Sequence, residues 1–75
     1  MTEMDFRIRP YTKRELATLY FPMTANPETA VANLRNLMRR NETLMQELAE
    51  TGYSARDKTF TPLQVGIIVR FLGEP

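Results

Sequence analysis

Hydrophobic and charged side chains alternate at the start of the chain. Residues 4–8 place an apolar side chain at every second position, and Pro10 follows closely. Alternation with a period of two predicts a short, half-buried strand that ends before the proline. Because an isolated strand is not stable in water, it needs a partner. We expect residues 4–8 to pair with residues 57–60 in a minor two-stranded β element.

The next segment carries the start signal of a helix. Thr12 is followed three residues later by Glu15, so each side chain can bind the other residue's backbone amide in a capping box. We expect this helix to end at the pair Phe21-Pro22, because a residue that precedes proline avoids helical backbone angles. The apolar side chains expected on its buried face are Leu16, Leu19 and Tyr20.

Two further helices are predicted, each with an asparagine cap. Asn26 precedes Pro27, which suits the first helical position because an N–H group there has no helical partner. Asn41 ends this helix and caps a third one, which stops at Gly52. The apolar residues with helical spacing are Ala30, Val31, Leu34, Leu37 and Met38 in one helix, and Leu44, Met45 and Leu48 in the other.

The segment before Gly73 supports two interpretations. Thr61 and Gln64 have the spacing of a second capping box, whereas the run VGIIV at 65–69 is rich in the β-branched residues typical of a buried strand. Start and stop signals bracket residues 62–72 at a length common for helices. We therefore predict a fourth helix that ends at about Leu72.

This last helix has apolar residues on two nearly opposite faces. One face includes Val65 and Ile68, and the other consists of Leu63, Ile67 and Phe71. A helix that is apolar on both sides is expected to be covered on both. Either the N-terminal strand covers the second face, or that face is the interface of a homodimer or of a complex with another protein.

These signals together predict a mainly α fold. We expect a small four-helix domain, helix-turn-helix-like in its arrangement, with a minor two-stranded β element. A chain of 75 residues has the size of one domain, so residues 1–75 form a single domain in this prediction. The side chains expected to dominate the core are Leu16, Leu19, Leu34, Leu37, Leu48, Val65, Ile68 and Val69.

The composition argues against an enzyme. The chain has no cysteine and no histidine, which removes disulfides, thiolate nucleophiles, imidazole bases and the usual zinc ligands. Glu47 and Glu50 could share a metal ion or a proton, but the solvated face of an amphipathic helix explains them equally well. Tyr53 and Lys58 lack the spacing and the glycine-rich loop of a dehydrogenase pair. We expect no catalytic residue, no metal site, no cofactor and no small-molecule substrate.

Charge and hydropathy indicate the kind of ligand and the cellular location to expect. The formal net charge is only +1, but residues 1–41 hold seven basic and four acidic side chains, so an anion-binding face is expected in the first half. No apolar run approaches the roughly 20 residues that a membrane span needs. The first residues also lack the apolar core of a signal peptide. Without cysteine to exploit an oxidising compartment, a cytoplasmic location away from membranes is expected.

The residues Glu-Leu-Ala at 15–17 resemble the first helix of a helix-turn-helix unit, in which a small side chain lets the second helix cross closely. The second helix would be residues 27–40. Arginine suits phosphates and guanine edges, and asparagine suits adenine, so the polar face of this helix predicts contact with DNA. The candidate nucleic-acid-binding residues are Arg35, Asn36, Arg39 and Arg40, helped by Lys13 and Arg14.

Two features differ from that motif. The turn between Pro22 and Pro27 is longer than usual and has no glycine. Bases are read mainly by the N-terminal residues of the second helix, which here include Glu28 and Thr29. A solvated basic face without a ligand is the alternative interpretation.

The chain also resembles a family of short bacterial proteins. The motifs that carry the resemblance are Glu15-Leu16-Ala17 with Tyr20-Phe21-Pro22, Thr61-Pro62 with Gln64-Val65, and Leu72-Gly73-Glu74-Pro75, within a similarity that spans residues 11–75. The family is classed as a domain of unknown function and is common in gut-dwelling anaerobes. The resemblance implies no activity, ligand or site residue, and only a distant relation to helix-turn-helix regulators.

Two functions from different classes follow. The leading hypothesis is a non-catalytic nucleic-acid-binding or regulatory module of helix-turn-helix type, with DNA as its partner. The alternative is a protein-interaction or homo-oligomerisation module with no nucleic-acid role, which uses Leu63, Ile67 and Phe71.

Overall fold

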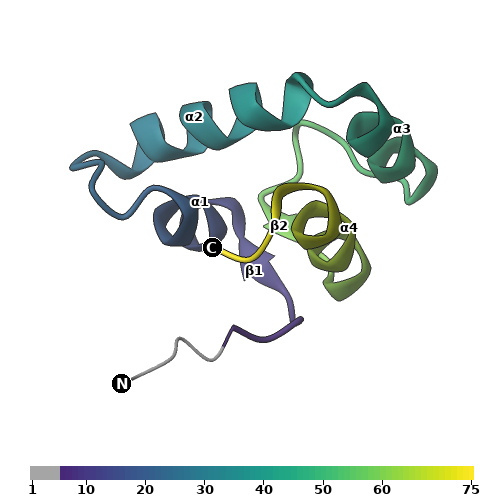
Figure 1. Cartoon of the computed structure of the whole chain (residues 1–75), viewed down its shortest axis with the longest axis horizontal. Helices are drawn as coiled ribbons and strands as arrows, with labels where there is room; N and C mark the ends of the chain where they lie inside the picture. The colour runs from purple at the N-terminus through teal and green to yellow at the C-terminus, as the bar shows by residue number, and fades with distance from the viewer. Residues whose placement is uncertain (1–5) are drawn as a thin grey trace.

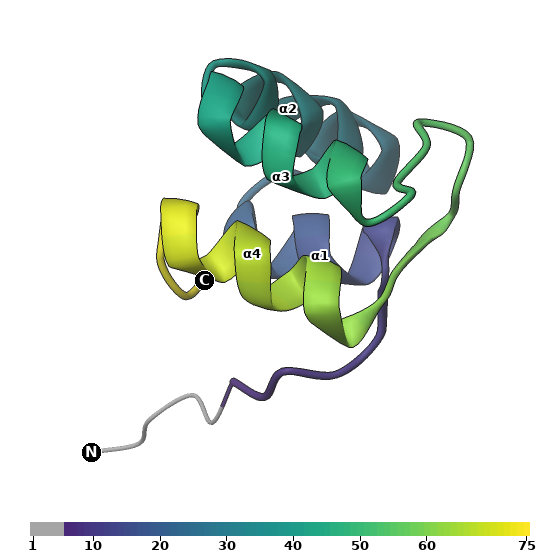
Figure 2. The ribbon, with the colours of Figure 1, turned by 90° about the vertical axis from the view of Figure 1, so that its right-hand side faces the viewer.

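A computed structural model describes residues 6–75, which contain four helices and two very short strands (Figure 1). This confirms the predicted four-helix domain with a minor two-stranded element. In chain order the elements are β1 (Tyr11–Thr12), α1 (Lys13–Tyr20), α2 (Pro27–Arg39), α3 (Glu42–Glu50), β2 (Thr59–Phe60) and α4 (Pro62–Leu72). Helices α2 and α3 form one layer, and α1 and α4 form the other (Figure 2).

The helices begin where their caps were predicted. In the first capping box the Glu15 amide donates to Thr12 Oγ1 at 3.0 Å, and the Thr12 amide donates to Glu15 Oε1 at 2.9 Å. Thr61 and Gln64 form the same reciprocal pair at the start of α4. A favourable N-cap contributes about 1 kcal/mol to stability. Because capping depends on residues three positions apart, these starts are readable from local sequence.

The predicted position of the first strand is wrong. The structure pairs Tyr11–Thr12 with Thr59–Phe60 in antiparallel register, and residues 6–8 form no strand. Met4 and Asp5 lie outside the described residues. The physical reason is burial: the Tyr11 side chain is 4% exposed, whereas Ile8 is 52% exposed. Pairing at Tyr11 therefore fills the core, and Phe6 only stacks its ring on that of Tyr11, with centroids 5.4 Å apart.

Helix α4 confirms the helical interpretation of the run at 65–69. Val65 and Ile68 are fully buried. On the opposite face Ile67 and Phe71 are half-buried against the core, while Leu63 is exposed. Residues 6–10 run along the side of α1 and α4 that faces away from α2, without forming the predicted covering strand (Figures 1 and 2).

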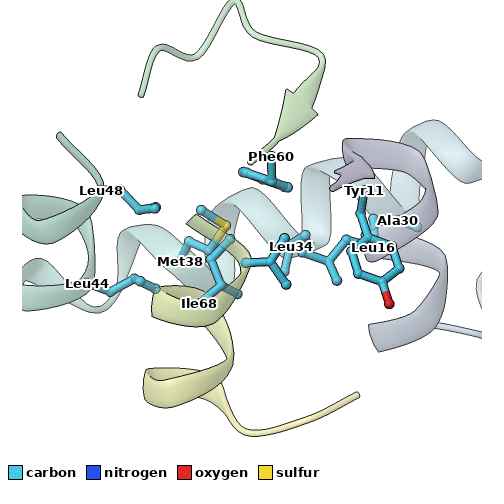
Figure 3. Packing of buried hydrophobic residues seen from close by; sticks show 11 residues of the cluster. Tyr11, Leu16, Ala30, Leu34, Met38, Leu44, Leu48, Phe60 and Ile68 are labelled. Carbon is cyan, nitrogen blue, oxygen red and sulfur yellow. The ribbon is translucent and has the colours of Figure 1, made fainter. Parts of the chain in front are cut away.

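The core lies between the two layers (Figure 3). Of the side chains predicted to dominate it, Leu19, Leu37 and Val69 are only half-buried, and only Leu19 and Val69 of these pack against the buried cluster. Figure 3 places Leu44 and Leu48 of α3 toward one end and Leu16 and Tyr11 toward the other. The buried apolar residues are Tyr11, Leu16, Ala17, Ala30, Leu34, Met38, Leu44, Leu48, Phe60, Val65 and Ile68.

One polar side chain is part of this core. Gln64 is 4% exposed, and its Nε2 donates to Thr51 Oγ1 at 2.9 Å. The Thr51 hydroxyl donates in turn to the Leu48 carbonyl at 2.6 Å. Within residues 6–75 no buried side-chain nitrogen or oxygen lacks a partner. The Gln64 amide thus joins the start of α4 to the end of α3 at no cost in unsatisfied polar groups.

The C-terminal residues fold back on α1. The Tyr20 hydroxyl donates to the Gly73 carbonyl just after α4 ends. Burial, together with the negative charge of Glu74, raises the pKa of Tyr20 to about 12. Both effects disfavour the tyrosinate form, so the protonated hydroxyl is the form that holds this contact.

Candidate nucleic-acid interface

An open groove lies where the start of α1, one side of α2 from Glu28 to Arg35, and residues 55–58 meet. Its volume is about 760 Å³. Five basic and two acidic side chains line it, which leaves an excess of three positive charges. We call this site the basic groove. Its charged residues are Lys13, Arg14, Arg35, Arg56 and Lys58 on the positive side and Glu28 and Asp57 on the negative side.

Backbone hydrogen bonds build the wall formed by residues 55–58. The Lys13 amide donates to the Lys58 carbonyl at 2.9 Å, directly beyond the β1–β2 pairing. Asp57 closes a turn on Ser54, because the Asp57 amide donates to the Ser54 carbonyl and the Ser54 amide donates to Asp57 Oδ2. Figure 2 shows the loop after α3 standing beside α1 and α2 at one end of the molecule. The strand pairing therefore sets two distant basic segments side by side.

Two of the five cations already have partners within the protein. The Lys13 ammonium donates to the Ala55 carbonyl at 3.0 Å and lies 4.9 Å from the centroid of the Tyr53 ring. Arg14 pairs with Glu28 at 3.0 Å. Both members of that pair are mostly exposed, and such surface pairs contribute about 0–1 kcal/mol. A ligand can displace Glu28 from Arg14 at little cost.

The other three cations have no such partner in the part of the chain that the structure describes. The side chains of Arg35, Arg56 and Lys58 make no hydrogen bond or ion pair with any of residues 6–75. They are exposed, and they share one concave surface. Like charges gathered in a groove raise the local positive potential and attract anions with several charges.

A small apolar notch adjoins the basic groove. Lys13, Val31 and Arg35 line both, and the notch also reaches Tyr53 and Phe60. Its volume is about 20 Å³, which holds about one water molecule. The notch is therefore an apolar margin of the groove and not a separate ligand cavity.

The predicted nucleic-acid-binding residues divide into two sets. Lys13, Arg14 and Arg35 line the basic groove, whereas Asn36, Arg39 and Arg40 do not. Arg39 follows Arg35 by one helical turn on the same side of α2, beyond the groove. Arg40 is the C-cap of that helix. All three are exposed.

Sequence reasoning missed Arg56 and Lys58. The excess of basic side chains over residues 1–41 had placed the expected anion-binding face in the first half of the chain. The signal that would have found them is the strand register: pairing of Thr12 with Thr59 brings Lys58 next to the start of α1. The groove takes its charges from both halves.

The three predicted interface residues of α4 differ in exposure. Leu63 is 65% exposed, while Ile67 and Phe71 pack partly against the core. Arg70, which precedes Phe71 in α4, pairs with Glu47 of α3 and lies 5.1 Å from the centroid of the Phe71 ring. Glu47 thus links two helices instead of standing free on an acidic face.

Two further properties bear on function. Within residues 6–75 no three acidic side chains are close enough together to hold a metal ion. None of the helices in this part of the chain combines the length and the apolar character needed to cross a bilayer.

Comparison with known proteins gives the family. No curated protein and no solved structure matches the chain. A family model described as a domain of unknown function matches residues 7–75, which is nearly the whole chain. The chain therefore belongs to the DUF4248 family.

Proposed function

We propose that this protein is a non-catalytic, cytoplasmic nucleic-acid-binding module that holds phosphate groups in the basic groove. The observation that supports this proposal is the presence of three cations, Arg35, Arg56 and Lys58, that share one groove and have no acidic partner in residues 6–75. Guanidinium and ammonium groups bind phosphate through charge-assisted hydrogen bonds. With a net charge of only +1, long-range attraction is weak, so the groove itself supplies the binding.

The groove favours phosphate contact over base reading in the helix-turn-helix manner. In that motif the start of the second helix enters the major groove. Here Glu28 occupies the first turn of α2 and pairs with Arg14, which places a negative charge at that position. Asn36, the side chain best suited to adenine, lies outside the basic groove. We therefore propose that the module binds the backbone with little preference for sequence.

The test is the salt dependence of binding. Fluorescence anisotropy of labelled random-sequence oligonucleotides should show affinity that falls steeply between about 50 and 200 mM salt. The variant with Arg35→Gln, Arg56→Gln and Lys58→Gln should reduce the log–log slope by about 0.7–0.9 for each phosphate that the protein no longer neutralises. No binding at the lower salt concentration would reject the proposal.

A matched control separates the basic groove from the outer face of α2. The variant with Arg39→Gln and Arg40→Gln also removes exposed positive charge that has no acidic partner among residues 6–75, but outside the groove. If phosphates bind in the groove, this control keeps most of the wild-type slope. A larger reduction in the control would place the phosphates on the predicted outer residues instead.

The second proposal is self-association through Leu63. The exposed Leu63, together with the half-buried Ile67 and Phe71 on the same face of α4, is the observation that supports this role. Light scattering over a wide concentration range should then show a dimer that Leu63→Gln dissociates. A strict monomer at every concentration would reject the homodimer, and the phosphate-binding proposal would be unaffected.

A further inference from the structure

A second groove adjoins the basic groove at Arg14. This second groove has a volume of about 450 Å³, and we call it the mixed groove. Its lining combines apolar surface from Tyr11, Leu19 and Pro27 with the guanidinium groups of Arg9 and Arg14 and the carboxylate of Glu15. Arg14 lines both grooves, which makes them neighbours on the surface.

We propose that the ligand of these two grooves is single-stranded, not duplex, nucleic acid. The proposal rests on the phosphate-binding function proposed above and specifies its substrate. The basic groove would hold successive phosphates, and the mixed groove would take the apolar face of an unstacked base. Both grooves would be used by one strand that passes over Arg14.

The shape of the cationic surface supports a single strand. A protein that reads duplex DNA inserts a protruding helix or ribbon into a major groove about 12 Å wide. Here Arg35 is the cation of α2 that lines the basic groove. The other walls of this concavity are the start of α1 and residues 55–58. A flexible single strand can follow the concavity.

The mixture of apolar and cationic surface supports the same ligand. Proteins that bind single strands combine a positively charged groove with surfaces on which bases stack, and arginine adds cation–π attraction. The Arg9 guanidinium lies 3.9 Å from the centroid of the Tyr11 ring, and Phe6 also stacks on that buried ring. The surface left for a base in the mixed groove is therefore the exposed guanidinium of Arg9 and not the Tyr11 ring itself. A duplex hides its base faces inside the stack, where such a surface cannot reach them.

The test compares two probes of equal length on the intact protein: oligo(dT), which forms no internal duplex, and a random-sequence duplex. At one salt concentration, anisotropy should give a lower Kd for oligo(dT) by about fivefold or more, the lower end of what one stacked base contributes. Equal or tighter binding of the duplex would reject this proposal and leave phosphate binding intact. No binding of either probe would reject both.

Variants then test the path over Arg14. Arg9→Gln and Arg14→Gln should each weaken oligo(dT) binding and bring its Kd toward that of the duplex. Arg40→Gln is the control, since it removes one exposed charge outside both grooves and should leave the ratio of the two Kd values unchanged. A ratio that falls equally in all three variants would show only general charge attraction and would overturn the assignment.

Spectroscopy provides a readout independent of affinity. Titration of oligo(dT) into isotope-labelled protein should shift the amide resonances of residues 12–14 and 55–58, which surround the basic groove. Shifts confined to α3 and the end of α4 would place the ligand elsewhere and overturn the proposal.

Discussion

The backbone amide of Lys13 donates to the carbonyl oxygen of Lys58 at 2.9 Å, and this bond places two basic residues from opposite halves of the chain at one groove. Lys13 is the first residue of α1, a position where the N–H group has no partner within the helix. The strand pairing supplies that partner from outside. The register of the two short strands thereby assembles the basic groove.

The Lys13 amide should be protected from hydrogen exchange. The first amides of a helix usually exchange quickly because only water accepts from them. The bond to Lys58 predicts that the Lys13 amide exchanges more slowly than that of Arg14, the next residue of the same helix turn. Exchange measured residue by residue by NMR checks this. Equal rates at the two positions would mean that the wall of the basic groove opens freely.

The capping threonines should contribute measurably to stability. Thr12→Ala and Thr61→Ala each remove a side chain that accepts from the third amide of its helix. Each should lower the free energy of unfolding by about 0.5–2 kcal/mol, measured by urea denaturation. Thr18→Ala is the matched control, because Thr18 is exposed within α1 and caps nothing. A decrease at Thr18 as large as those at the caps would contradict the assignment.

Two leucines should differ sharply in their effect. Leu48 of α3 is fully buried in the core, so Leu48→Ala should cost about 2–5 kcal/mol through reduced burial and the cavity left behind. A chain of this size has a small stability margin, and this variant should be largely unfolded in mild denaturant. Leu63→Ala should change stability by at most about 0.5 kcal/mol, because Leu63 is 65% exposed. Thermal and urea melts followed by circular dichroism compare the two.

Tyr20 should make stability fall at alkaline pH. Its pKa is about 12 in the folded protein and 10.0 without the fold, so the unfolded chain loses this proton first. The contribution of the hydroxyl is complete below pH 10 and is lost as the pH rises from 10 toward about 12. Tyr20→Phe should remove this part of the pH dependence in urea melts. Glu74→Gln should lower the pKa of Tyr20 in an absorbance titration, since the negative charge of Glu74 contributes to the shift.

The helices were predictable because their signals are local. Thr12 with Glu15, and Thr61 with Gln64, lie three residues apart, and each pair acts on its own helix start. Even the ambiguous run at 65–69 was resolved correctly by the signals that flank it. The helix cap at Thr61 and the stop at Gly73, which lie a suitable distance apart, outweighed the strand propensity of this run.

The strand and half of the basic groove were not predictable in the same way. Alternation at 4–8 indicated a strand, but the core selected Tyr11 as the residue opposite Phe60. The register depends on which aromatic ring fills the space between the two helix layers, and no pattern of neighbouring residues indicates which ring that is. Arg56 and Lys58 depend on this register for their place in the groove, so they were missed together with it.

The manner in which residues 55–58 are held has a consequence for engineering. Main-chain atoms and the Asp57 turn fix this wall, while the side chains of Arg56 and Lys58 anchor nothing within residues 6–75. Arg56 and Lys58 can therefore be replaced without changing the backbone that carries them. Replacing both with glutamate would reverse the sign of the net charge that lines the basic groove, while the helices and the core stay as they are. The same scaffold would then be suited to display designed recognition loops for cationic targets.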